Sequence, residues 1–259
     1  MLNTKDLTNT MKCSKCACDA VITQRYSGMS LCPKHFTADF ESRAKKAIRK
    51  HGWLSRNDVI AVDYDGSYAA AALLHLLVKF FAKRPDIGLV LTGDSKETLR
   101  TVADRYGIGY AVKSSLRSAT HKTSASANGS ASVAGELGCT KIAVAATLDS
   151  EAEFVFECIL KGDSKGLLSR GRCGDGEIPM IMPLMNIPAA EAELYCRIHG
   201  IDAGDEAGHE ISDNGADTEL PKLAKELLDE YAGEHPAAKY ALVNLMEEFQ
   251  NTDMRDDSE

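Results

Sequence analysis

Residues 59–70 read Val59-Ile60-Ala61-Val62-Asp63-Tyr64-Asp65-Gly66-Ser67-Tyr68-Ala69-Ala70, and this stretch decides the fold class. Its first four residues form a short apolar run typical of a strand that is buried on both faces. Gly66 then indicates a turn, and the apolar segment after it predicts a helix over 69–83. A buried strand, a turn and a helix make up the repeating unit of a parallel α/β sheet.

The same pattern recurs downstream. Further strands are expected at 87–91, 110–112 and 141–145, with helices at 96–106 and 150–160. The alternation predicts an α/β fold, a Rossmann-like doubly wound parallel sheet over 57–200 with ligand sites at the carboxyl ends of its strands. The stretch 114–132 is too rich in Ser, Thr, Ala and Gly to assign, and 164–177 is expected to be a loop.

Beyond the sheet the sequence predicts a helical C-terminus. Helices are expected at 189–199, 219–233 and 237–250, so that 201–250 forms a closing helical segment. We expect the tail 251–259 to be disordered, because it is polar and highly charged.

A compact module of residues 11–36 precedes the sheet. Cys13 and Cys16 are separated by two residues, as are Cys32 and His35, and fifteen residues lie between the pairs. Such paired spacing allows four side chains to grip one tetrahedral ion, which predicts a zinc knuckle with a structural role. Chance clustering or a single disulfide remains the alternative. The roles of the scattered cysteines stay open (Cys139, Cys158, Cys173, Cys196).

Residues 37–56 are expected to form a basic helix and a linker. One face of the helix carries Arg43, Lys45, Lys46, Arg49 and Lys50. Cations placed beside a metal knuckle indicate contacts with the phosphates of a nucleic acid. A solvated helix face explains the same pattern.

Composition narrows the class of protein. The chain has 259 residues with 44% hydrophobic and 26% charged residues, typical of a soluble globular protein, and no run is long enough to span a bilayer. With no signal-peptide pattern at its start, we expect a cytoplasmic protein. The net charge of −8 is uneven: 12–56 holds ten Lys and Arg, whereas 202–259 holds seventeen Asp and Glu. The acidic C-terminal segment, residues 202–259, favours a protein partner over a polyanion.

Several stretches together resemble a known family. They include Met11-Lys12-Cys13-Ser14-Lys15-Cys16, Leu31-Cys32-Pro33-Lys34-His35-Phe36 and Leu148-Asp149-Ser150-Glu151-Ala152-Glu153. From about residue 11 to 250 the chain resembles the tRNA 2-thiouridine synthetases of the PP-loop ATPase superfamily. The resemblance implies the superfamily's fold and an ATP-dependent tRNA uridine 2-sulfurtransferase activity.

The chain departs from this family at the residues that carry its chemistry. The family's phosphate-binding loop SGGxDS falls on residues 65–70, where only Gly66 is retained and Ala69 and Ala70 replace the Asp and the final Ser. Its GHN motif falls on Ala145-Ala146-Thr147. The cysteines that hold an iron–sulfur cluster in the family have no counterpart between Cys32 and Cys139, and the second such position falls on Gly208-His209. A C-terminal zinc module of the family is replaced by 251–259.

These departures set the functional expectations. The loop residues Asp65, Gly66 and Ser67, with Asp149, form at most a degenerate ATP site, although helix capping also explains Asp149. We assign no catalytic residue, regard ATP with Mg²⁺ as doubtful and do not expect an iron–sulfur cluster. The preferred hypothesis is a non-catalytic pseudoenzyme that binds tRNA or forms a dimer with a copy or a catalytic paralogue. An active sulfurtransferase with drifted motifs, and a nucleotide sensor or protein scaffold, are the alternatives.

Overall fold

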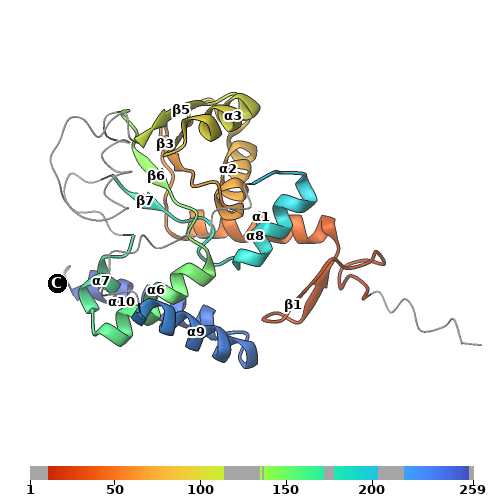
Figure 1. Ribbon diagram of the computed structural model, residues 1–259, viewed down its shortest axis with the longest axis vertical. Helices are drawn as coiled ribbons and strands as arrows, with labels where there is room; N and C mark the ends of the chain where they lie inside the picture. The colour runs from red at the N-terminus through yellow and green to blue at the C-terminus, as the bar shows by residue number, and fades with distance from the viewer. Residues whose placement is uncertain (1–10, 114–134, 136, 172–177, 204–218, 257–259) are drawn as a thin grey trace, which may run out of the picture.

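The computed structural model describes residues 11–113, 135, 137–171, 178–203 and 219–256 (Figure 1). The unassigned stretch 114–132, Cys173 and His209 lie outside the described residues.

A five-stranded parallel sheet forms the centre of the fold. Its strands lie in the order β5-β4-β3-β6-β7. Their bounds are β3 Val59–Asp63, β4 Gly88–Gly93, β5 Gly109–Val112, β6 Lys141–Ala143 and β7 Met180–Ile181. The chain runs outward from β3 to β5, then returns to pair β6 with the other side of β3. This order places the topological switch point between β3 and β6, where α/β proteins bind their ligands. The predicted α/β fold is confirmed.

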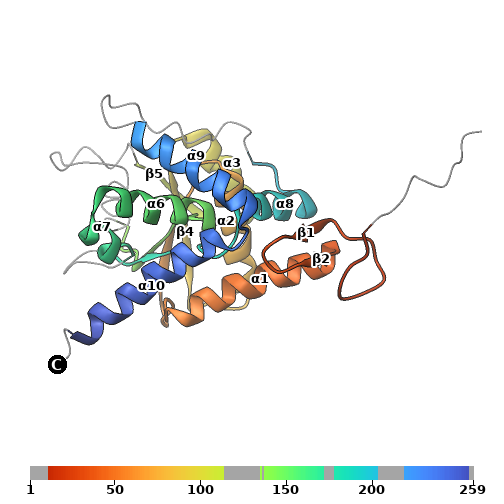
Figure 2. The same cartoon turned by 90° about the horizontal axis from the view of Figure 1, so that it is seen from below.

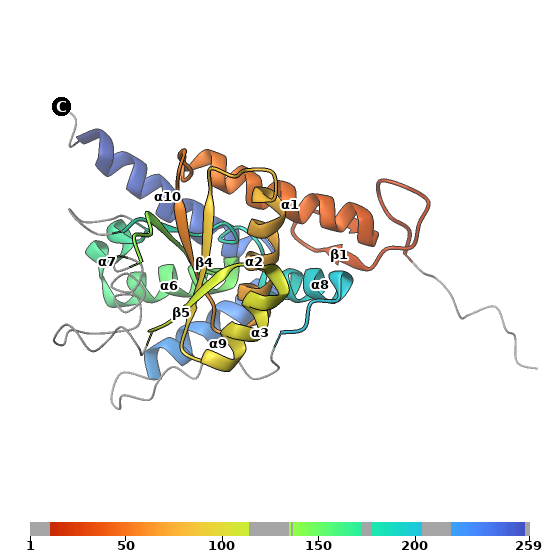
Figure 3. The same cartoon turned by 90° about the horizontal axis from the view of Figure 1, so that it is seen from above.

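Helices cover both faces of the sheet (Figure 3). Helices α2 (Tyr68–Phe81) and α3 (Lys96–Tyr106) follow β3 and β4, and the main core joins them to α1 (Pro33–Lys50) and α8 (Ala189–His199). A second core joins α6 (Leu148–Lys161), α7 (Ser164–Ser169) and the C-terminal helices α9 (Glu219–Glu234) and α10 (Ala238–Asp256). Alternate residues of β3 serve different cores, since Ile60 and Val62 join the first core whereas Ala61 joins a third, smaller cluster.

The N-terminal module is a two-stranded hairpin. Strands β1 (Ile22–Gln24) and β2 (Met29–Leu31) pair antiparallel, and α1 follows directly. Leu31, Phe36 and Phe40 are fully buried in the main core, so the module is anchored to the sheet domain by α1. Figure 2 shows the hairpin beside one end of α1.

Two expectations at the helical end need revision. A short helix, α7, occupies part of the segment expected to be a loop, because Asp163 caps its first turn by accepting a bond from the N–H of Gly166 (2.9 Å). Helix α10 continues through Asp256, into the segment expected to be disordered. In the described part of the chain, no helix has the length and apolar character that crossing a membrane requires.

Candidate functional site

The four predicted metal ligands converge at the base of the N-terminal hairpin. The ligand atoms of Cys13, Cys16, Cys32 and His35 all lie within 4.8 Å of one another. The Sγ atoms of Cys16 and Cys32 are 3.7 Å apart, and the His35 Nδ1 atom lies 3.4 Å from the Sγ atoms of Cys13 and Cys32. Cys18, the spare cysteine of the segment, is exposed and stands outside this group.

These spacings fit one tetrahedral ion. Two thiolates bound to one metal at about 2.3 Å with tetrahedral angles lie roughly 3.8 Å apart, close to the separation of Cys16 and Cys32. The surroundings of Cys13 also favour its thiolate form. Burial acts to raise the pKa of Cys13. Hydrogen bonds from the N–H groups of Cys32 and Lys15 and from neighbouring side chains outweigh this effect and lower the pKa to about 6. The thiolate is the form that binds metal. The residues present therefore fit a metal ion, and the chain has an N-terminal Cys/His metal-binding knuckle.

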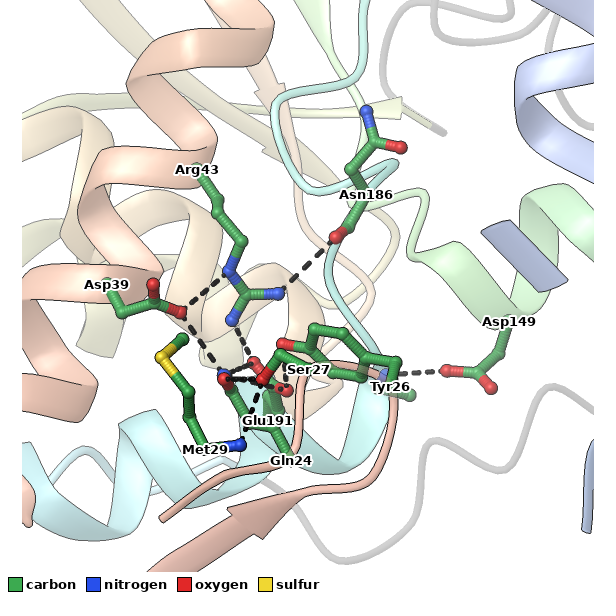
Figure 4. Close-up of polar contacts among 10 residues, drawn as sticks. Gln24, Tyr26, Ser27, Met29, Asp39, Arg43, Asp149, Asn186 and Glu191 are labelled. Carbon is green, nitrogen blue, oxygen red and sulfur yellow. Dashed lines mark hydrogen bonds and ion pairs between the residues drawn. The ribbon is translucent and has the colours of Figure 1, made fainter. Parts of the chain in front are cut away.

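A buried polar cluster joins the knuckle to the sheet domain (Figure 4). Glu191, in the first turn of α8, is 3% exposed and accepts hydrogen bonds from Tyr26 Oη (2.8 Å) and Gln24 Nε2 (3.3 Å), both on the hairpin. Its carboxylate also forms an ion pair with Arg43 of α1, and the Arg43 Nε atom lies 2.9 Å from Asp39. A buried carboxylate is stable only when it is paired and hydrogen-bonded, as here. We therefore interpret this cluster as the joint that orients the knuckle.

The same hairpin touches the C-terminal helices. Arg25 donates to the carbonyl oxygen of Gly233 (2.6 Å), and the rings of Tyr26 and Tyr240 lie 4.8 Å apart. The turn between β1 and β2 thus contacts the C-terminal helices α9 and α10. Sequence reasoning assigned no site role to Gln24, Tyr26 or Glu191, because the contacts that join them link residues more than 160 positions apart.

The loop after β3 is closed by its own side chains. Gly66 has a φ of 87°, which favours glycine, and the Asp65 carboxylate accepts a bond from the N–H of Ser67 (2.9 Å). Ser67 caps α2 by accepting from the N–H of Ala70 (3.1 Å). A helix N-terminus binds phosphate through such free amides. Here the chain's own carboxylate and hydroxyl use them, and Asp65 adds negative charge where an anion would bind.

Close packing fixes the same loop against β4. The N–H of Tyr64 donates to the carbonyl oxygen of Thr92 (2.7 Å), and Tyr64 is buried. A Cβ atom at Gly93 would lie 2.4 Å from the Tyr64 carbonyl oxygen, so only glycine fits there. The Asp65–Ser67 turn is therefore held by the strand beside it.

Asp149 lies in the first turn of α6, which follows β6 on the other side of the switch point. Thr147, not Asp149, caps α6, through a reciprocal pair of bonds with Ser150. The Asp149 carboxylate instead accepts from the N–H of Ala189 at the start of α8 (2.7 Å) and forms an ion pair with Lys239 of α10 (2.7 Å). Asp149 thus joins three helices, a role that differs from the predicted N-cap.

A second buried carboxylate lies in α6. Glu151 is fully buried and forms an ion pair with Arg170, whose guanidinium also lies over the ring of Phe154, 4.4 Å from its centroid. Sequence reasoning did not assign this pair a role. It fixes the chain after α7 against α6.

The five basic residues of α1 do not form one surface. Arg43 is directed inward to Glu191, Lys45 lies 3.8 Å from Glu41, and Lys50 forms an ion pair with Glu247 of α10. Lys46 and Arg49 are exposed and have no ion pair within the part of the chain that the structure describes. Lys15 and Lys34 of the knuckle are exposed as well. Exposed cations without an ion pair in the described chain thus include Lys46 and Arg49 of α1 and Lys15 and Lys34 beside the metal ligands.

Three of the scattered cysteines are buried thiols. Burial raises the pKa of Cys139 and of Cys158, and raises that of Cys196 to about 12. A high thiol pKa reduces the nucleophilic thiolate fraction near neutral pH, so these three have the character of core residues.

Comparison with known proteins agrees with this arrangement. Residues 12–37 match the family model for the N-terminal LIM domain of 2-thiouridine synthetase TtuA. The tRNA 2-thiolation protein NcsA of Haloferax volcanii is 26% identical over 74% of this chain and 74% of that protein. A probable sulfurtransferase of Methanocaldococcus jannaschii is 24% identical over 76% of this chain and 67% of the relative.

A solved structure shares the fold. It is the U34-tRNA thiolase NcsA from Methanococcus maripaludis with its 4Fe–4S cluster. The TM-score is 0.78, and the match covers 94% of this chain and 88% of that chain with 21% sequence identity. Sheet order, switch point and metal knuckle define an α/β protein that shares the fold of this thiolase. In sequence the chain is similar to TtuA- and NcsA-type tRNA thiolation proteins.

One cofactor expectation is wrong. We did not expect an iron–sulfur cluster, because the middle of the sheet domain lacks the family's cysteines. The solved protein of the same fold carries a 4Fe–4S cluster. The knuckle of this chain supplies clustered thiolates, a ligand type that iron–sulfur clusters share with zinc. The assignment of zinc alone, without iron–sulfur chemistry, is therefore withdrawn.

Proposed function

We propose that this chain is a tRNA-binding member of the thiolation family that does not itself transfer sulfur, and that it acts beside a catalytic paralogue. The observation that carries the proposal is the loop after β3. The Asp65 carboxylate and the Ser67 hydroxyl engage amides at the start of α2, where the family's phosphate loop binds ATP. A nucleotide would have to displace these bonds and approach a like charge.

The other side of the switch point supports the same proposal. Ala145 and Ala146 stand where the family has polar residues, and neither offers a polar side chain. The Asp149 carboxylate is engaged by Lys239 and by the N–H of Ala189. A magnesium ion at Asp149 would have to compete with an ammonium group that is largely buried.

We assign tRNA recognition to the knuckle and the outer side of α1. Lys15, Lys34, Lys46 and Arg49 carry positive charge into solvent from two adjoining elements. Each phosphate that a cation neutralises releases counterions, which adds affinity that falls as salt rises. In this proposal Cys13, Cys16, Cys32 and His35 hold the metal that keeps the knuckle, and therefore Lys15 and Lys34, in place.

Filter binding of a tRNA transcript across a salt series tests the proposal. We expect the wild-type chain to bind, and the variant Lys46→Gln/Arg49→Gln to bind more weakly, with a salt slope smaller by about 1 to 2. Lys165→Gln, which removes an exposed cation from α7, is the matched control and should leave the slope unchanged. Failure of the wild-type chain to bind tRNA would overturn the proposal and favour a sensor or scaffold.

An active sulfurtransferase is the second candidate, favoured by the names of the relatives. That function needs an activated uridine and hence ATP. ATP–pyrophosphate exchange in the presence of tRNA separates the two functions, because a non-catalytic binder gives no exchange above the blank.

A further inference from the structure

The C-terminal halves of α1 and α2 contact each other and end in exposed cations. Lys79 of α2 forms an ion pair with Glu41 of α1 (2.5 Å), and the Lys45 ammonium of α1 lies 4.4 Å from the centroid of the Phe80 ring. These contacts hold the ends of the two helices together. Three exposed cations follow them along the chain, Lys46 and Arg49 on α1 and Lys83 two residues after α2.

The segment before β3 adds a fourth exposed cation, Arg56. The N–H of Gly88 donates to the carbonyl oxygen of Asp58 (2.9 Å), so the segments that lead into β3 and β4 lie beside each other. The carboxylates of the region are already engaged: Glu41 pairs with Lys45 and Lys79, and Asp86 pairs with Arg84. Four cations have no ion pair within the described residues, and we call them the basic edge: Lys46, Arg49, Arg56 and Lys83.

The basic edge lies at the opposite end of the sheet from the Asp65–Ser67 loop. Arg56 precedes β3, whereas the loop follows it, and a strand of five residues is about 16 Å long. Lys83 follows α2, whereas Ser67 caps its start, and a helix of 14 residues is about 21 Å long. In Figure 3 α1 lies along the upper edge of the molecule. A ligand on the basic edge therefore cannot reach the loop after β3 of the same chain.

Two observations favour RNA as the occupant. The rings of His51 and Trp53, which lie in sequence between Arg49 and Arg56, stack 4.5 Å apart at 13°. His51 is 25% exposed and its Nε2 atom is fixed by Glu247 (3.1 Å), so the pair forms an ordered aromatic platform beside the cations. Single-stranded RNA binds to such combinations of cations and stacking rings. An anionic membrane also attracts cations, but none of the exposed large hydrophobic side chains of the described residues, which would insert into it, lies here.

We infer that RNA binds across the basic edge, with its phosphates on the four cations and an unpaired base against the His51–Trp53 pair. The inference rests on the proposed function for RNA binding as such. It adds Arg56, Lys83 and the ring pair to the contact, and it determines the direction in which the RNA is held. An RNA bound here faces away from this chain's own β3 loop and is open to a second protein.

Two matched double variants test this placement by filter binding of tRNA across a salt series. For Arg56→Gln/Lys83→Gln we expect a salt slope smaller by about 1 to 2 and, at about 0.1 M salt, a dissociation constant higher by about tenfold or more. Lys96→Gln/Lys165→Gln removes the same charge from exposed positions of α3 and α7 and should change neither quantity. Far-UV circular dichroism of both variants shows whether the fold is intact.

The wild-type chain provides a second measurement, since Trp53 is its single tryptophan. We expect the emission of Trp53 to change on addition of tRNA, with the midpoint found by filter binding. Unchanged emission at saturating tRNA would overturn the placement, as would equal effects of the two double variants. So would Arg56→Gln/Lys83→Gln losing binding to phosphatidylserine vesicles while it keeps its tRNA affinity. Failure of the wild-type chain to bind tRNA at all would overturn the proposed function as well.

Discussion

The ammonium group of Lys239 lies 2.7 Å from Asp149 and 2.6 Å from Asp229, and its side chain is only 14% exposed. Lys239 belongs to α10, Asp229 to α9 and Asp149 to the first turn of α6. One cation therefore ties both C-terminal helices to the start of α6, which follows β6 in the chain. The burial of Lys239 acts to lower its pKa, but its two carboxylate partners outweigh this and raise it, so the ammonium form is retained.

Replacing Lys239 with methionine should destabilise the protein by about 1–2 kcal/mol, because two carboxylates lose a charged partner while the apolar stem is kept. Urea denaturation followed by circular dichroism measures the change. The control is Lys225→Met on α9, whose exposed ion pair with Glu153 (3.6 Å) should contribute less than about 0.5 kcal/mol. Equal effects of the two variants would contradict the role given to Lys239.

Changing Glu191 to glutamine should loosen the knuckle from the sheet domain. Arg43 would then be buried beside Asp39 alone, and we expect a loss of about 2–4 kcal/mol in the free energy of unfolding. Glu193→Gln on the same helix is the matched variant, since Glu193 forms only a surface pair with Arg197. Limited proteolysis within the hairpin should accelerate in the Glu191 variant and not in the Glu193 variant.

The knuckle should depend on its metal. Cys16→Ser removes one of four converging ligands, so we expect loss of bound metal and a lower melting temperature. Elemental analysis with ultraviolet–visible spectroscopy, on protein purified without oxygen, gives both the amount and the identity of the metal. The control is Cys18→Ser, which changes a cysteine of the same segment that lies outside the ligand group and should retain full occupancy. Equal metal content in the two variants would show that the ligand set is wrong.

Acidification should destabilise the fold through a histidine pair. The rings of His75 and His199 lie 5.2 Å apart. Burial lowers the pKa of both histidines. The neighbouring His199 and Lys79 lower the pKa of His75 further. Near pH 6.5, the ordinary pKa of a histidine, the unfolded chain therefore binds more protons than the folded chain. The free energy of unfolding thus falls as the pH drops through this value. Denaturation midpoints between pH 7.5 and about 5.5 test this. The decline should be smaller in His75→Gln/His199→Gln, and an unchanged decline would contradict the assignment.

The sheet and the knuckle could be predicted because their signals are local. The apolar run at Val59, the turn at Gly66 and the paired spacing from Cys13 to His35 each reflect the geometry of a few consecutive residues. The helices at 96–106 and 189–199 begin and end as expected, since Gly107 and Gly200 end them and Ser95 caps the first. Charge patterns were less informative. Arg43 and Lys50 belong to the predicted basic face, yet both pair with carboxylates from α8 and α10, more than 140 positions away along the chain.

The buried carboxylates are the part that sequence alone did not reveal. Glu191 and Glu151 become structural only because Arg43 and Arg170 reach them in three dimensions. The same holds for Asp149, whose place just before the predicted helix 150–160 suggested a cap, whereas it lies in the first turn of α6. Its actual partners, Ala189 and Lys239, are 40 and 90 positions away.

The most direct test of the central claim is an assay for sulfur installed in RNA. The chain, purified without oxygen and with its metal intact, is incubated with tRNA, ATP, Mg²⁺ and sulfide, and 2-thiouridine is quantified by mass spectrometry of the digested nucleosides. We predict that tRNA is bound but that no 2-thiouridine forms above the protein-free blank. Formation of 2-thiouridine together with consumption of ATP would contradict the proposal that this chain binds tRNA without modifying it.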